Sequence, residues 1–364
     1  MHLTSDVILK EIAPKLATIF DVYKSDKYKS AFHELDYIQP ERDVATVEKL
    51  NQELVAAINR RASDLKLSMA YPDQIDYSNC DYFKIRVPGI PRNQKIVSYV
   101  GIPVLYQILD LSKKPVTIEE LKLHKIVGFS GAHEPLTGGD SIFSYLVFET
   151  DEINGHKYVL SNRNWYRINA DFIKQTDADL LHIIPNFSNT PPLKPWSKIK
   201  NSKGQDSYDE GQYNSLYKGN NGFLYLDKQW FQSFGKGNKK SRTEIADLFH
   251  FDTNKLICIK KGREAASLSA LWAQGSVSAE LFQGLPAYRD EFLKRVRAQW
   301  SASSGTITNE LIKSLTFCFA IGTEQTYPNI VSLLPVFSRI NLLRHARLLE
   351  KMNFKVEVAC IKQI

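Results

Sequence analysis

The chain has 364 residues, 43% of them hydrophobic and 11% aromatic, so it is long enough for two domains that each bury a core. Its four cysteines lie far apart and form no C-x-x-C pair, which argues against a disulfide framework or a zinc knuckle. No stretch approaches the ~20 consecutive apolar residues of a membrane helix, and the first residues lack a signal-peptide pattern. We therefore expect a cytoplasmic protein without membrane contact.

The formal net charge of +7 is unevenly distributed. Residues 188–364 contain 25 Lys and Arg against 15 Asp and Glu, a balance of +10. Residues 1–187 contain 22 Lys and Arg against 25 Asp and Glu, a balance of −3. Such a split favours a polyanionic partner for the second half, although a merely solvated basic surface remains an alternative.

The first half alternates between helix and strand patterns. Helical spacing of apolar residues predicts helices within 44–67 and 100–111, and Thr117 is expected to cap another that begins at Ile118. Alternation of apolar and polar residues predicts strands at 83–87, 144–149, 157–160 and 165–168. The pair Asn154-Gly155 predicts a hairpin turn. We expect residues 1–187 to form an α+β domain with a small antiparallel sheet and no catalytic constellation.

A proline-rich stretch separates the two halves. Pro185, Pro191, Pro192 and Pro195 precede a polar run that ends near Gln205, and prolines remove backbone donors and fix φ. We interpret residues 188–206 as an extended linker before a second domain of residues 207–364.

The second half has a distinctive element order. A helix is followed by three strands, two helices, a strand, a helix and a final strand. The expected ranges are 209–218, then 222–226, 245–249 and 256–260, then 267–282 and 288–300, then 315–321, 340–352 and 355–361. The run at 315–321 is continuously apolar, as in strands buried on both faces. The fold class expected here is a mixed sheet flanked by helices.

This order matches the core of the PD-(D/E)XK nucleases, the restriction-endonuclease fold. Their chemistry needs an Asp at the second strand and an acid-x-Lys on the third, because carboxylates hold Mg²⁺ or Mn²⁺ and the lysine stabilises developing negative charge. Asp247 occupies the position of the metal-binding Asp and Lys260 that of the lysine. Glu210, on the preceding helix, matches an accessory metal ligand.

The third strand departs from this pattern at one position. Cys258 stands where the acid is expected, and a thiol is a poor ligand for a hard cation. Glu264 or Gln274 could compensate, and Glu244 is a further supporting residue. Two alternatives stay open: the site is degenerate and binds without cutting, or Asp247 and Lys260 are ordinary strand ends.

Basic residues surround these positions. They belong to a Gly-rich loop before the second strand and to the end of the third strand, and they could grip phosphates. The candidates for nucleic-acid contact are Lys236, Lys239, Lys240, Arg242, Lys261 and Arg263.

Several segments resemble a sporadically distributed and largely uncharacterised bacterial family that is linked to phage-defence or mobile loci. They are Glu210-x-x-Tyr213-Asn214, Glu244-x-x-Asp247-Leu248, Ile257-Cys258-Ile259-Lys260, Ser267-Leu268-Ser269-x-Leu271-x-x-Gln274-Gly275 and the run from Leu334 to Leu342. The resemblance spans most of the chain and implies a defence-associated role. That family often has His or a similar residue where Cys258 stands, so the resemblance implies that the missing acid is a trait of the family.

The first hypothesis from these patterns is a metal-dependent nuclease that acts on DNA. Asp247 and Glu210 would bind Mg²⁺ or Mn²⁺, and Lys260 would be the electrostatic catalyst. The second hypothesis is a nucleic-acid-binding or sensor module that does not cut. The third is a protein-interaction component of a defence complex, and either a homo-oligomer or a defence-complex partner is compatible with the sequence.

Overall fold

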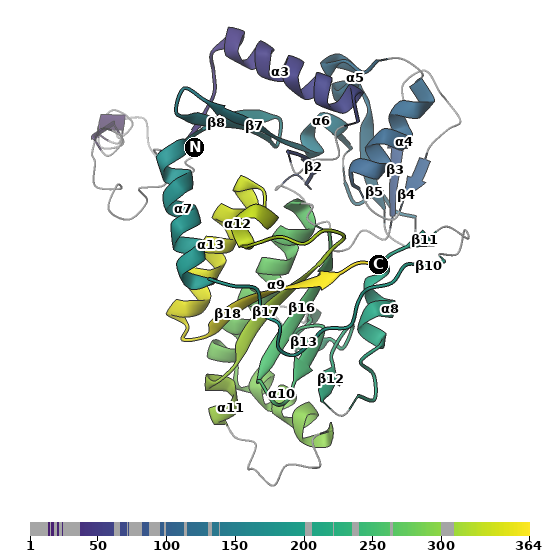
Figure 1. Ribbon diagram of the computed structural model, residues 1–364, viewed down its shortest axis with the longest axis vertical. Helices are drawn as coiled ribbons and strands as arrows, with labels where there is room; N and C mark the ends of the chain where they lie inside the picture. The colour runs from purple at the N-terminus through teal and green to yellow at the C-terminus, as the bar shows by residue number, and fades with distance from the viewer. Residues whose placement is uncertain are drawn as a thin grey trace.

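The computed structural model describes most of the chain from residue 37 onward. The described residues are 14, 16–17, 20–21, 24, 37–61, 66–70, 72, 82–86, 95–97, 100–112, 115–129, 133–137, 139–200, 206–220, 222–234, 240–262, 265–299 and 309–364. In Figure 1 the first half lies above the second half, and both combine helices with sheets. The expectation of a mixed α/β chain is confirmed.

The first sheet of the N-terminal half is antiparallel throughout, with the order β1-β9-β8-β7-β2. Its strands are β1 (Ile38–Pro40), β2 (Leu67–Met69), β7 (Leu146–Ile153), β8 (His156–Ser161) and β9 (Asn164–Asn169), and α3 (Val44–Asn59) follows β1. The predicted turn joins β7 to β8, where Asn154 and Gly155 have φ of 51° and 74°. An Asn-Gly pair suits this turn because both residues tolerate positive φ.

A second antiparallel sheet has the order β4-β3-β5-β6. It contains β3 (Tyr82–Arg86), β4 (Lys95–Val97), β5 (Lys125–Phe129) and β6 (Asp140–Ser141), with helices α4 (Ile102–Ser112), α5 (Ile118–Leu123) and α6 (Ile142–Tyr145). Thr117 caps α5 in a capping box with Glu120, as its position before the helix predicts. Apolar residues of both sheets share one core, which includes Leu54, Leu105 and Trp165.

The C-terminal half is built on a mixed sheet with the order β12-β15-β16-β17-β18. The first three strands pair antiparallel, whereas β17 is parallel to both β16 and β18. The strands are β12 (Phe223–Tyr225), β15 (Leu248–His250), β16 (Lys255–Lys261), β17 (Thr316–Thr323) and β18 (Lys355–Lys362). A hairpin of β13 (Phe231–Phe234) and β14 (Lys240–Thr243) is inserted between β12 and β15.

Helices connect the parallel strands of this sheet. The connection from β16 to β17 contains α9 (Ala265–Gly284), α10 (Pro286–Gln299) and α11 (Asn309–Lys313), and that from β17 to β18 contains α12 (Ile330–Leu333) and α13 (Val336–Lys351). Alternate residues of β16 face opposite sides. Leu256 and Cys258 belong to the large core that also holds residues of α9, α10 and α13, whereas Ile257 and Ile259 pack with α8 (Glu210–Ser215).

The proline-rich segment lies along the edge of the sheet next to β18. The backbone N–H of Ser188 donates to the carbonyl of Val358 at 2.7 Å, and that of Trp196 donates to Lys362 at 2.8 Å. The Trp196 side chain is buried and stacks on Tyr213 of α8, with 4.5 Å between ring centroids. A short pair, β10 (Ile199–Lys200) and β11 (Asp206–Ser207), then leads into α8.

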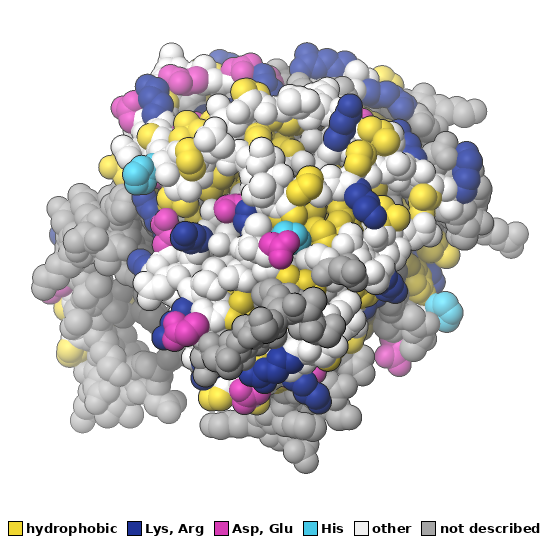
Figure 2. Space-filling model, turned by 60° about the horizontal axis from the view of Figure 1, so that its bottom comes forward, with side chains coloured by type: hydrophobic (Ala, Val, Ile, Leu, Met, Phe, Trp, Pro, Cys, Tyr) yellow, Lys and Arg dark blue, Asp and Glu magenta, His cyan; other side chains and the backbone are white. Residues whose placement is uncertain are grey.

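Among the described residues, no helix is both long and apolar enough to cross a membrane. The face turned forward in Figure 2 carries Lys and Arg side chains that are scattered among polar and apolar groups, with Asp and Glu between them.

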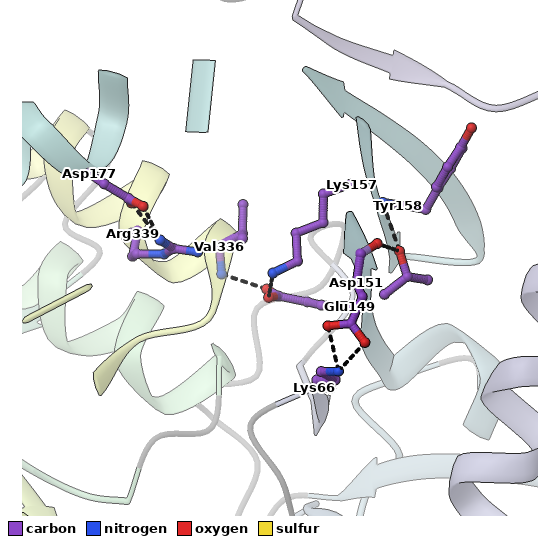
Figure 3. Close-up of polar contacts among 9 residues, drawn as sticks. Lys66, Glu149, Asp151, Lys157, Tyr158, Asp177, Val336 and Arg339 are labelled. Carbon is purple, nitrogen blue, oxygen red and sulfur yellow. Dashed lines mark hydrogen bonds and ion pairs between the residues drawn. The ribbon is translucent and has the colours of Figure 1, made fainter. Parts of the chain in front are cut away.

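A polar network joins the two halves (Figure 3). Glu149 of β7 is buried and accepts a hydrogen bond of 2.6 Å from the backbone N–H of Val336, the first residue of α13. Nearby, Nη1 of Arg339 donates to both carboxylate oxygens of Asp177 at 2.5 Å. Asp177 belongs to α7 (Ala170–Ile183), which packs on α13. The N-terminal sheet and helix α13 are therefore held together by buried charge as well as apolar contact.

Candidate metal centre

The candidate site lies at one end of the C-terminal sheet, where β12 ends, β15 begins and β16 ends. The N–H groups of Leu226 and Asp227 both donate to the carbonyl of Asp247, at 2.9 and 3.0 Å, and the N–H of Asp247 donates to Ile257 at 3.1 Å. Sheet pairing therefore places Asp227 beside Asp247. Side chains at this end of the sheet converge from three neighbouring strands.

Three carboxylates form a compact group in this place. One oxygen from each of Asp227, Glu244 and Asp247 lies within 4.8 Å of the other two. Asp227 and Asp247 are buried, and Glu244 is half-buried. Acidic groups that share a buried site repel one another, so the arrangement needs either protons or a cation. We refer to these three residues as the acid cluster.

Asp247 is the most deeply placed member of the acid cluster. Its Oδ2 accepts a hydrogen bond of 2.7 Å from the backbone N–H of Ile259, and its Oδ1 accepts one of 2.9 Å from Nδ2 of Asn214 on α8. Burial and the neighbouring Glu244 raise the pKa of Asp247 to about 8, although the Ile259 hydrogen bond and the Lys260 charge oppose that rise. Asp247 therefore carries a proton at neutral pH.

The two other acids accept hydrogen bonds from the last residue of β12 and from the turn after it. Glu244 accepts one from the backbone N–H of Lys228, whose φ of 58° lies in the left-handed region. Asp227 accepts one of 2.9 Å from the hydroxyl of Tyr225. Burial raises the pKa of Glu244, and the Lys228 hydrogen bond only partly offsets this. A turn conformation that costs energy for a non-glycine residue is thus used to orient the cluster.

A lysine–glutamate pair borders the acid cluster. Nζ of Lys260 donates to Oε2 of Glu210 at 2.7 Å, and the backbone N–H of Lys261 donates to Oε1 of the same carboxylate at 3.1 Å. Burial alone would lower the pKa of Lys260, but the charges of Glu210, Asp247 and Glu244 outweigh it and raise the pKa. Lys260 therefore keeps its positive charge next to the acids.

The donor set of the acid cluster fits a small divalent cation. Mg²⁺ and Mn²⁺ prefer oxygen ligands such as carboxylates. Three carboxylate oxygens lie within 4.8 Å of one another here, close enough for one cation to contact all of them. The raised pKa values of Asp247 and Glu244 have the same physical origin, buried charge that lacks compensation. A cation bound between these oxygens would supply that compensation and displace the proton.

Comparison with protein families adds one firm result. A family model described as "Family of unknown function (DUF6119)" matches residues 1–362. The chain belongs to this family. Membership of an uncharacterised family agrees with the resemblance seen in the sequence. No curated protein and no solved structure matches the chain.

In this DUF6119 protein, the residues predicted from the nuclease pattern come together only in part. Asp247 joins the acid cluster, and the carboxylates of Asp247 and Glu244 act electrostatically on Lys260. Glu210 binds Lys260 instead of belonging to the group of three carboxylates. Glu244, expected only as a supporting residue, is a full member of the group.

Asp227 is not among the residues that the sequence patterns predict for the site. The nuclease pattern draws its first acid from the second strand, so an acid after the first strand had no assigned role. The sequence shows Asp227 directly after the apolar run that forms β12, but the antiparallel pairing that places this end of β12 beside the start of β15 is visible only in the structure.

Cys258 and Gln274 hold different places around the site. Cys258 is fully buried in the large core on the α9 side, and burial raises the pKa of its thiol well above the usual value. It is thus a small core residue, as its apolar neighbours in the sequence predict. Gln274 of α9 donates a long hydrogen bond of 3.5 Å to Oε2 of Glu244.

The predicted phosphate-contacting residues are only partly described. Lys261 lies at the end of β16, and its Nζ donates to the carbonyl of Tyr208 at 3.4 Å. Lys240 and Arg242 lie on β14, where the backbone alone is described. Lys236, Lys239, Arg263 and Glu264 lie outside the described residues.

Proposed function

We propose that this protein is a metal-dependent nuclease that acts on DNA, with its active centre at the acid cluster. The observation that carries the proposal is the convergence of three carboxylates within 4.8 Å, next to a charged lysine, at the end of a mixed sheet. The order α8, β12, β15, β16, α9, β17 supports assigning the restriction-endonuclease fold to the C-terminal half. The resemblance to a family linked to phage-defence loci supports a role in anti-phage defence.

Each side chain has a distinct role in this proposal. Asp227, Glu244 and Asp247 would hold Mg²⁺ or Mn²⁺, which supplies a Lewis acid and a water of lowered pKa when bound. Lys260 stabilises the negative charge that develops on the phosphate, and its raised pKa makes it an electrostatic group in place of a general base. Glu210 positions Lys260 through the 2.7 Å ion pair.

The direct test is cleavage of labelled DNA and RNA by the purified chain with Mg²⁺ or Mn²⁺. We expect metal-dependent cleavage of DNA, and a loss of at least ~100-fold both in Asp247→Asn, which removes a proposed metal ligand, and in Lys260→Met, which removes positive charge at the reacting phosphate. Arg347→Met, on a remote ion pair, is the matched control and should keep full activity. Absence of cleavage by the wild-type chain with both metals would refute the nuclease.

A second candidate function is nucleic-acid binding without cleavage. It is favoured by β16, which offers buried Cys258 two residues before Lys260 where a nuclease of this class has an acid. This alternative predicts DNA binding that survives chelation of divalent metal and the Asp247→Asn substitution, because phosphate contacts by lysines would carry the affinity.

A further inference from the structure

Net charge alone does not locate a binding surface on this molecule, since cationic side chains are scattered over the face in Figure 2. The arrangement of a few lysines around α8 is more informative. Each of three lysine ammonium groups lies over a tyrosine ring. The distances from Nζ to ring centroid are 5.4 Å for Lys194 and Tyr217, 5.2 Å for Lys198 and Tyr208, and 4.5 Å for Lys218 and Tyr225.

These six residues, here the Lys–Tyr surface, are prepared to bind an anion. A cation–π contact attracts the ammonium group to the ring face and thereby restricts a long side chain. A restricted lysine loses less entropy when it meets a phosphate, so its contact is stronger than that of a freely rotating one. Because the ammonium groups cover the rings, the surface offers charge to a phosphate and not an open ring face to a base.

The Lys–Tyr surface is connected to the acid cluster on two sides. The Tyr225 hydroxyl, below Lys218, donates to Oδ2 of Asp227 at 2.9 Å. The Tyr208 carbonyl accepts the 3.4 Å hydrogen bond from Lys261, the neighbour of Lys260. Two of the three lysine–tyrosine pairs are therefore linked by hydrogen bonds to residues in or next to the acid cluster.

The local charge pattern also suits a polyanion. Residues 180–205 contain four lysines and no acidic residue. The side chains of Lys194 and Lys198 are exposed. Lys198 has an acidic neighbour, the exposed carboxylate of Glu324 at 3.7 Å, and Lys194 donates to the carbonyl of Leu216 at 3.0 Å. An exposed ion pair such as Lys198–Glu324 is weak, so it competes little with a phosphate.

We propose that the sugar–phosphate backbone of DNA lies along the Lys–Tyr surface, with Lys194, Lys198 and Lys218 each contacting a phosphate. This inference rests on the proposed nuclease function and names where its substrate is held. Contacts to phosphates carry no base information, so binding through this surface is independent of sequence.

The test compares two triple variants with equal loss of charge. Lys194→Gln/Lys198→Gln/Lys218→Gln removes the proposed contacts. Lys122→Gln/Lys174→Gln/Lys313→Gln removes three exposed lysines elsewhere, and Lys122 also lies over a ring, that of Phe143. Binding of a fluorescent duplex to both variants and to wild type is measured by anisotropy over a range of salt concentrations, with Ca²⁺ in place of Mg²⁺.

We expect the first variant to bind ~10–100-fold more weakly and to lose about 2–3 from the slope of log K against log salt, because each phosphate contact contributes about 0.9. The control variant should keep a slope close to that of wild type. Equal slopes for the two variants would overturn the Lys–Tyr surface while wild-type cleavage still supported the nuclease. Wild-type protein that binds no DNA at low salt would overturn both, and tighter binding of duplex RNA would overturn the assignment to DNA.

Discussion

At the scale of single residues, Asp247 decides how the site behaves. Backbone hydrogen bonds to the neighbouring strands fix its main chain. Its two carboxylate oxygens accept hydrogen bonds from the backbone N–H of Ile259 and from the side-chain amide of Asn214. These contacts hold the carboxyl group close to Glu244. The hydrogen bonds favour the ionised form, but burial and the neighbouring acid favour the protonated form and prevail. Without a cation, the protonated, neutral form of the Asp247 carboxyl is therefore favoured in the folded chain.

The first prediction concerns the proton on Asp247. Because the pKa is about 8, this carboxyl is mainly protonated at pH 7 and must release its proton when a divalent cation binds. Titration calorimetry with Mn²⁺ at pH 7 in buffers of different ionisation enthalpy should show release of close to one proton. In Asp247→Asn the release should disappear. Binding of Mn²⁺ to wild type without proton release would contradict the raised pKa.

The second prediction follows from the same pKa by linkage. Between the unfolded value of about 4 and the folded value of about 8, the folded chain holds a proton that the unfolded chain has lost. Stability in the absence of metal should therefore fall as pH rises from 5 to 8, with an upper limit on the order of several kcal/mol. Urea unfolding at several pH values should show this slope in wild type and a flatter profile in Asp247→Asn. Equal pH profiles of stability for the two proteins would show that Asp247 does not cause the slope.

The sequence predicted part of this site. Asp247 and Lys260 could be predicted because Asp247 lies within one apolar run and Lys260 ends the next, at a spacing that a known nuclease pattern demands. The role of Asp227 depends on β12 pairing with β15 across the inserted hairpin, and no local pattern encodes that register. The sequence predicts Glu210 as a metal ligand, but it cannot show that the Glu210 carboxylate also pairs with Lys260.

At the scale of elements, close packing between α9 and β17 positions the core behind the site. Gly275 of α9 faces Phe319, and a Cβ at this glycine would come within 2.6 Å of the Phe319 ring. Trp272, one turn earlier, packs edge-on against the same ring with 5.0 Å between centroids. The helix can lie this near the strand only because position 275 has no side chain.

The third prediction tests that contact. Gly275→Ala should destabilise the chain by roughly 1–3 kcal/mol, since the added methyl group meets a ring in a packed core. Gly284→Ala in the same helix is the matched control, because a Cβ there has no neighbour within 4 Å. It should leave the chain unchanged or slightly more stable. Urea unfolding of both variants measures the difference, and similar midpoints would contradict the close approach.

Most elements of the C-terminal half lie where apolar periodicity predicts them, but one strand of that half and one helix at the end of the first half differ. The strand expected at 245–249 begins only at Leu248, and before it the carbonyl of Ile245 accepts a hydrogen bond of 2.6 Å from the Ser278 hydroxyl. Helix α7 was not predicted at all. Its buried residue Leu180 packs into the C-terminal core, so the helix depends on contacts far away in the sequence.

At the scale of the whole molecule, charged contacts between distant segments hold the halves together (Figure 3). Glu149 reaches the first turn of α13 across 187 residues of sequence, and a carboxylate at a helix N-terminus is favourably placed. Burial nevertheless raises the pKa of Glu149, while Lys157 and Arg339 oppose the rise. Sequence patterns could not predict this contact, because periodicity and capping signals are local and do not show which distant residues will meet.

The last prediction concerns the two arginine–aspartate pairs between α13 and α7. Arg339 binds Asp177 with 9% and 23% of the side chains exposed, whereas Arg347 binds Asp179 with 44% and 28% exposed. Arg339→Met should cost about 2–4 kcal/mol because it leaves the Asp177 carboxylate largely buried without its partner. Arg347→Met removes the same charge from the same helix, yet should cost no more than about 1 kcal/mol because water replaces the lost contact. Urea unfolding gives both values, and equal losses would show that burial of the first pair does not hold the halves together.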